Sequence, residues 1–243
     1  MGEMPTQAKF LTGNLTHHII TMSLTSAIGF VALFAVDLVD MLFISMLGVD
    51  ELAAAIGFAG TILFMTTSIS IGMAIAGGAM VAKSLGQNKP QLATQLLTHV
   101  LIVGLVFSVI FASLIYTNLH ALTALIGAKG NTQELAVSYL EILIPSMPIL
   151  LVGIVASAAL RSHGAAQLSM TVTLVAGLVN IILDPIFIFT FNLGLDGAAW
   201  ASVLSRISMA MLAVWYIVRR YNGFARLSLR AMKQDLKPIA AIA

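Results

Sequence analysis

The chain contains repeated apolar runs that are long enough to cross a lipid bilayer, and this feature restricts its fold more than any other. A helix needs about 20 apolar residues to span the hydrocarbon core of a membrane. Only 9% of the residues are charged, whereas soluble domains carry about 25%. We therefore predict the all-α fold class: a polytopic membrane protein with a six-transmembrane-helix bundle. The predicted spans cover residues 19–47, 52–82, 92–117, 136–160, 167–190 and 197–218.

The basic residues predict how the chain is oriented in the membrane. If both ends of the chain lie on one side, the segments on that side hold ten of the 12 Lys and Arg residues, whereas the opposite loops hold only Lys129. Cytoplasmic loops are enriched in Lys and Arg, so we expect a multi-pass protein of the cell (inner) membrane with a cytoplasmic N-terminus. The ten residues are Lys9, Lys83, Lys89, Arg161, Arg219, Arg220, Arg226, Arg230, Lys233 and Lys237.

This topology divides the chain into three predicted segments. Residues 1–16 form a cytoplasmic N-terminal segment, and residues 17–218 form the six-helix transmembrane lobe. Residues 219–243 form a basic cytoplasmic linker, predicted to lie on the membrane surface as a helix, and the start of a truncated seventh span. An even number of spans returns the chain to its starting side, so a second lobe can follow in the same orientation.

An aspartate followed directly by proline lies inside the fifth apolar run, at Asp184 and Pro185. A carboxylate in hydrocarbon is costly, and membrane proteins that keep one usually use it for ion or proton traffic. The proline removes a backbone donor and frees the carbonyl of Ile181. Asn180 lies one helical turn from the aspartate on the same face. These groups predict a binding site for a small cation.

Two other spans are expected to bring polar groups to the same depth. At a rise of about 1.5 Å per residue, Asp40, Asp184 and Ser202 lie roughly 8–10 Å below the outer ends of their spans. Two carboxylates, an amide and a hydroxyl suit Na⁺, and they suit a proton equally well, since two adjacent carboxylates do not both ionise readily in a low dielectric. We predict a cation site formed by Asp40, Asn180, Asp184 and Ser202, with no cofactor other than the coupling ion, Na⁺ or H⁺. The alternative is a structural hydrogen bond between helices.

Four further titratable residues lie within the spans. Asp37 is one turn from Asp40 and either assists it or lines an aqueous cavity, and Arg206 either balances the carboxylates or extends toward the inside. These two are secondary candidates for the site. We expect Glu141 to reach interfacial water and His99 to pack or bond between helices.

The composition and motifs exclude several other classes of protein. The chain has no cysteine, so disulfides and thiol chemistry are ruled out. Its polar residues show no spacing typical of a nucleophilic triad or a metal hydrolase, and no glycine loop for phosphate. We therefore expect no enzymatic activity and no nucleic-acid partner.

Four motifs follow one another along the chain: Val39–Gly48 with Glu51-Leu-Ala-Ala, Ala82–Lys89, Leu160–Gly164 followed by Val179–Phe189, and Gly194–Ser202. In their order and spacing they resemble the multidrug and toxic compound extrusion (MATE) transporters over residues 17–237. Asn180 preceding Asp184 in the fifth span resembles the DinF-like branch most.

The resemblance implies one lobe, the N-terminal one, of a twelve-helix transporter. Members of this family are antiporters that export organic, often cationic compounds in exchange for Na⁺ or H⁺. The resemblance places Asp40, Asn180 and Asp184 at the cation site of that lobe, and Ser202 where the branch often has threonine. The expected partners are organic small molecules, the lipid bilayer, and the missing C-terminal lobe or a second copy of the chain.

Two alternative functions remain. One is a flippase for lipid or polysaccharide precursors from the same superfamily. Such flippases tend to line their cavity with basic residues, and Arg206 is the only basic residue within a span here. The other is a membrane scaffold that transports nothing.

Overall fold

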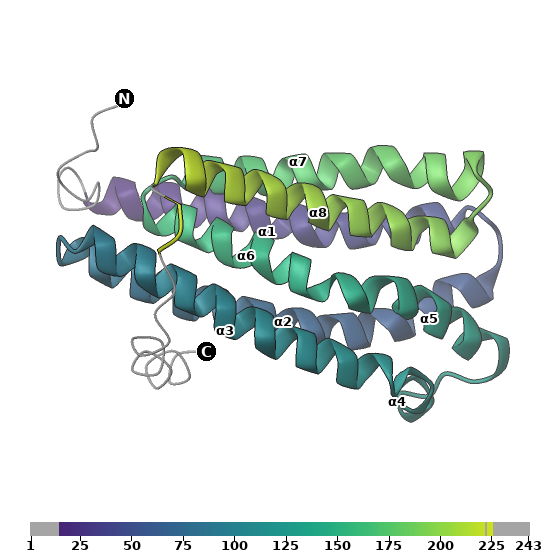
Figure 1. The fold of residues 1–243 in the computed structure, drawn as a ribbon. Helices are drawn as coiled ribbons and strands as arrows, with labels where there is room; N and C mark the ends of the chain where they lie inside the picture. The colour runs from purple at the N-terminus through teal and green to yellow at the C-terminus, as the bar shows by residue number, and fades with distance from the viewer. Residues whose placement is uncertain (1–14, 222, 226–243) are drawn as a thin grey trace.

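The computed structural model describes residues 15–221 and 223–225, and these form a bundle of long helices lying side by side (Figure 1). Among these described residues, six helical stretches are long and apolar enough to cross a membrane, which confirms the predicted fold class. The predicted N-terminal segment 1–16 and linker 219–243 lie mostly outside the described residues. The helices are α1 (Leu15–Ser45), α2 (Asp50–Gly86), α3 (Pro90–Tyr116), α4 (Leu119–Leu125), α5 (Gly130–Leu143), α6 (Met147–Ser162), α7 (Ala166–Pro185) and α8 (Gly194–Arg220), with a 3₁₀ turn η2 (Ile144–Ser146) and a π-helical segment η3 (Ile186–Thr190).

The helices form two groups that share α6. Helices α1, α7 and α8 pack together along one side of the bundle, and α2 and α3 pack together along the other. Helix α6 contacts α2 and α3 as well as α7 and α8. The candidate site residues come from α1, α7 and α8, so all of them lie in the first group.

The fourth span differs from its prediction in both length and continuity. Helical structure begins at Gly130 and continues to Ser162 through the 3₁₀ turn around Pro145. Proline has no backbone N–H and disturbs the regular hydrogen bonds of a helix, which accounts for the turn. The short helix α4 occupies part of the stretch that we expected to be a loop.

Small residues on α2 allow close packing against its neighbours. A Cβ atom added at Gly77 would lie 3.0 Å from Val100 Cγ1 on α3. The adjacent Gly78 accepts a hydrogen bond at its carbonyl from Ser162 Oγ of α6, at 2.8 Å. Small residues let membrane helices approach one another in this way.

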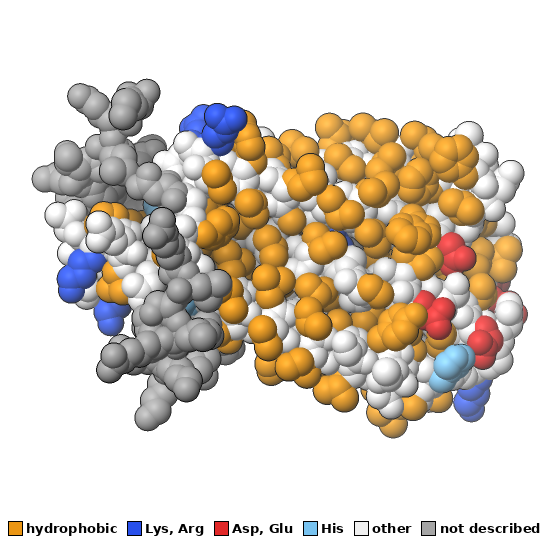
Figure 2. Space-filling view, viewed as in Figure 1, with side chains coloured by type: hydrophobic (Ala, Val, Ile, Leu, Met, Phe, Trp, Pro, Cys, Tyr) orange, Lys and Arg blue, Asp and Glu red, His pale blue; other side chains and the backbone are white. Residues whose placement is uncertain are grey.

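Charged side chains gather at opposite ends of the bundle, separated by a broad apolar belt (Figure 2). Lys83 and Lys89 flank the turn between α2 and α3, and Arg219 and Arg220 end α8 at the same end. The opposite end carries acidic groups such as Asp196, in the first turn of α8. This distribution matches the pattern used to predict the orientation, and the assignment of the basic end to the cytoplasm stays a prediction.

Candidate cation site

The structure brings together the four residues predicted for the cation site. Asp40 lies on α1, Asn180 and Asp184 lie one turn apart on α7, and Ser202 lies on α8. Their exposed fractions are 2%, 0%, 0% and 8%, in that order. The first helix, α1, and the consecutive helices α7 and α8, far from it in the sequence, therefore converge on one buried polar cluster.

Hydrogen bonds connect the cluster across the three helices. Ser202 Oγ donates to Asp40 Oδ2 at 3.0 Å, which links α8 to α1. The amide of Asn180 is oriented so that its nitrogen faces the carboxylates, because the opposite orientation would place its oxygen against acceptors alone. In this orientation it donates to Asp40 Oδ1 at 2.8 Å and to Asp184 Oδ2 at 3.3 Å. Asn180 thus bridges the two carboxyl groups.

The shared contact with the Asn180 amide nitrogen places the two carboxyl groups beside each other. Two ionised carboxylates repel in a low-dielectric interior, so a shared proton or a bound cation would stabilise the pair. Asp184 Oδ1 is buried and accepts no hydrogen bond from the described residues. The cluster therefore offers a free, buried oxygen ligand beside a carboxylate pair, and oxygen ligands of this kind suit a hard monovalent cation or a proton.

The sequence around Pro185 shapes the α7 side of the site. The helix does not stop at this proline but continues as the π-helical segment η3, in which Phe191 N–H donates to Ile186 O at 2.9 Å. Such wide turns are frequent at functional sites. Phe189 of η3 packs edge-on against Phe43 of α1, with 6.3 Å between ring centroids, and this contact holds α1 beside the site.

Helix α8 approaches this wide turn so closely that only glycine fits. A Cβ atom at Gly197 would lie 2.7 Å from the backbone carbon of Phe187 and 3.0 Å from the nitrogen of Ile188. Two turns further along α8, Ser205 Oγ donates to the carbonyl of Ala176 on α7 at 2.7 Å. These two contacts fix α8 against α7 and so fix the position of Ser202. In the sequence, Gly197 stands out only as part of a motif, since nothing there shows which backbone it meets.

Arg206 lies one turn beyond Ser202 on α8 and does not join the four-residue cluster. Its guanidinium donates to Leu143 O at 3.1 Å and to Ser146 Oγ at 2.6 Å, at the break between α5 and α6. It nevertheless lies close enough to Asp40 for electrostatic attraction. Arg206 thus supports the broken helix and remains near the carboxylates.

The other titratable residues lie apart from the cluster or outside the described side chains. The side chain of Asp37 lies outside the described residues, so its assistance to Asp40 stays a prediction. Glu141 is exposed, but it follows Gly130 by eleven residues, or roughly 16 Å of helix, and is therefore further along its span than we expected. His99 is fully buried on α3. No group of three or more His, Cys, Asp and Glu suitable for a metal gathers in the described part of the chain.

Among the described residues, six membrane-length apolar helices with a buried carboxylate pair on one side of the bundle define a polytopic membrane protein. The MatE family model matches residues 25–186, which is more than half of the chain. The chain therefore belongs to the MatE (multidrug and toxic compound extrusion) family of transporters. The DinF-like branch stays a prediction.

Individual relatives and solved structures agree with this family. The chain is 28% identical over 184 residues to the multidrug export protein MepA of Staphylococcus saprophyticus, covering 75% of this chain and 41% of that protein. It is 29% identical over 217 residues to the FAD transporter of Shewanella oneidensis, covering 86% of this chain and 47% of that protein. The chain is also similar to a crystal structure of MATE in the bent conformation, with 25% identity and a TM-score of 0.90, and the match covers 99% of this chain and 54% of the chain in that structure. The chain thus spans about half the length of its relatives.

Proposed function

We propose that this chain is the N-terminal lobe of a cation-coupled multidrug antiporter of the cell (inner) membrane. It exports organic, often cationic compounds in exchange for Na⁺ or H⁺, with its N-terminus in the cytoplasm. The observation that carries the proposal is the buried pair of Asp40 and Asp184, bridged by the Asn180 amide, with one Asp184 oxygen left open. The multidrug export relatives support the class of substrate.

The geometry supports a mechanism in which occupancy of the site changes how the helices pack. A cation or proton between the carboxyl groups of Asp40 and Asp184 removes their repulsion and holds α1 against α7. When the ion leaves, the pair repels, and the balance shifts toward a packing in which the two helices are further apart. The wide turn of η3, which is less regular than the helix before it, is the segment best placed to absorb such a change.

The function also requires a second lobe. The relatives are about twice as long as the matched part of this chain, and the proposed substrate cavity lies between two lobes. The second lobe is either a C-terminal lobe or another copy of this chain in the same orientation.

Dye efflux from vesicles tests the proposal. The purified 243-residue chain is reconstituted in two preparations, one with less than one chain per vesicle and one with many chains per vesicle. A Na⁺ gradient or a pH gradient then drives dye efflux. We expect no efflux from single chains; gradient-dependent efflux from vesicles with many chains would identify a second copy as the other lobe, and its absence would identify a C-terminal lobe. Efflux from vesicles with one chain each would contradict the need for a second lobe, and efflux that ignores both gradients would contradict cation coupling.

Paired variants locate the coupling ion. In a transporter that contains both lobes, Asp184→Asn should abolish gradient-dependent efflux while leaving the protein folded and inserted, because it removes the charge that the ion neutralises. Glu141→Gln is the matched control, since it removes an exposed carboxylate of the same bundle. Normal efflux by Asp184→Asn together with loss of efflux by Glu141→Gln would show that the cation site has been assigned to the wrong helices.

A further inference from the structure

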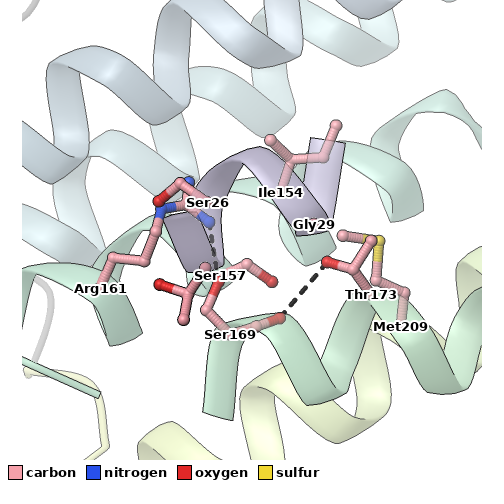
Figure 3. A pocket seen from close by; sticks show the side chains of 9 residues that line it. Ser26, Gly29, Ile154, Ser157, Arg161, Ser169, Thr173 and Met209 are labelled. Carbon is pink, nitrogen blue, oxygen red and sulfur yellow. Dashed lines mark hydrogen bonds between the residues drawn. The ribbon is translucent and has the colours of Figure 1, made fainter. Parts of the chain in front are cut away.

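A small cavity lies between α1, α6, α7 and α8, away from the cation site, and polar side chains project into it (Figure 3). Gly29 precedes Asp40 by eleven residues on α1, and Thr173 precedes Asn180 by seven on α7, so roughly 10–16 Å of helix separates the two sites. The cavity has a volume of about 30 Å³. It is lined by Thr25, Ser26, Gly29, Ile154, Ser157, Arg161, Ser169, Thr173 and Met209.

Arg161 supplies the positive charge of this cavity. From the sequence it was expected among the basic residues of a cytoplasmic loop, but it lies in the last turn of α6 and is half-buried. Its guanidinium turns into the bundle and donates to Ser169 Oγ of α7 at 2.7 Å (Figure 3). A guanidinium carries five N–H donors and no acceptor, so it favours an anion as a ligand.

Hydroxyl groups add further donors around the same space. Ser157 is 2% exposed, and its Oγ has no hydrogen-bond partner among the described residues. A buried hydroxyl without a partner is costly, which indicates that something in the cavity accepts its proton. By contrast, Thr173 donates its own proton to Ser169 O at 3.3 Å. Ser157 is thus a donor available to a ligand.

The remaining lining favours an anion over a cation and limits the size of the ligand. None of the described residues that line the cavity is acidic, and Gly29, Ile154 and Met209 give it apolar walls. In such a setting the attraction between a guanidinium and an anion is stronger than in water. A single water needs about 10–15 Å³ measured in this way, so the space holds about two waters or one monatomic anion. A phosphate or sulfate group is too large.

We propose that this cavity binds one halide ion, chloride under physiological conditions, between Arg161 and Ser157. The ion accepts hydrogen bonds from both side chains. Because Arg161 also bonds Ser169, the bound ion joins α6 to α7, the helix that carries Asn180 and Asp184. The site is separate from the proposed coupling ion, and its occupancy stabilises the bundle from the basic end.

Halide-dependent thermal stability of the purified chain tests the site. Chloride is titrated against gluconate at constant Na⁺ concentration, pH and ionic strength, so that the occupancy of the cation site stays constant. We expect a saturable rise in Tm with chloride and with bromide, and none with sulfate or phosphate at equal ionic strength. A Tm that does not depend on halide would overturn the proposal and leave two waters as the occupant, and an equal response to phosphate would overturn the size argument.

Three variants connect the response to this cavity. Arg161→Gln should abolish the halide response, whereas Arg219→Gln, an equal loss of charge at the exposed end of α8, should keep it. Ser157→Ala leaves the bond between Arg161 and Ser169 intact, and it should weaken halide binding by roughly 10- to 100-fold, as expected for one hydrogen bond to a charged group. An unchanged halide affinity in Ser157→Ala would contradict the proposal even if Arg161→Gln failed to fold.

Discussion

Replacing Gly197 by alanine tests how tightly the fold holds the candidate site. The added Cβ would lie 2.7 Å from the carbonyl carbon of Phe187 and 2.8 Å from its oxygen. Both atoms belong to the backbone of η3, so no side-chain rotation relieves the clash, and α8 must move away from α7. Overpacking of this kind costs about 1–3 kcal/mol. For a chain of 150–250 residues, each kcal/mol lowers Tm by about 2–4 °C, so Gly197→Ala should lose several degrees.

A second glycine serves as the control. A Cβ atom added at Gly57 on α2 would have no other atom within 4 Å, and glycine costs a helix about 0.5–1 kcal/mol relative to alanine. Gly57→Ala should therefore leave Tm unchanged or raise it. The assay is thermal unfolding of the purified proteins in the same detergent, followed by titration with Na⁺. Equal Tm values for Gly197→Ala and the wild type would refute the close approach of α8 to η3.

Three further predictions concern the cation site, the basic end and the topology. Ser202→Ala removes the donor to the buried carboxylate of Asp40, at a cost of about 1–3 kcal/mol. This variant should therefore lower both Tm and the Tm response to Na⁺, whereas Ser202→Thr should retain both. Equal losses in the two variants would contradict a role for the hydroxyl. Burial lowers the pKa of His163, which follows the last turn of α6, below its usual 6.5. Below pH 6.5 the unfolded chain therefore binds more protons than the folded chain, and the stability of the fold decreases as the pH falls. His163→Gln should flatten this decrease in unfolding experiments, whereas His120→Gln, at an exposed position, should not. In intact cells, Lys129→Cys should react with an impermeant thiol reagent from outside and Lys89→Cys should not, and the reverse pattern would invert the proposed orientation.

The sequence predicted the helical bundle well because lipid imposes a simple length rule. The spans are recognised from continuous apolar runs, and the six expected spans match the six membrane-length helical stretches in the described part of the chain. The break at Pro145 was missed because the run continues through the proline, and the π-helical segment after Pro185 was missed because only the expected loss of one backbone bond was visible. Helix boundaries depend on such local backbone geometry, which the apolar pattern does not encode.

The grouping of the candidate site residues could be anticipated from their depth in the membrane. Counting residues from the ends of the spans placed Asp40, Asp184 and Ser202 at one level, and in the structure hydrogen bonds through Ser202 and Asn180 connect them. The direction of long side chains could not be anticipated in the same way. Arg161 was assigned to a loop because it precedes a turn, yet its side chain turns back into the bundle. A long, flexible side chain at the end of a helix can point either way, and the choice depends on partners such as Ser169 on another helix.

The most direct test of the central claim is the infrared spectrum of the buried carboxyl pair. If Asp40 and Asp184 share a proton in Na⁺-free buffer, the wild type should show the band of a protonated carboxyl group. The account predicts that added Na⁺ or a rise in pH removes this band, that Asp184→Asn lacks the response, and that Glu141→Gln keeps it. A response that persists in Asp184→Asn, or that is absent from the wild type, would contradict a cation site between α1 and α7.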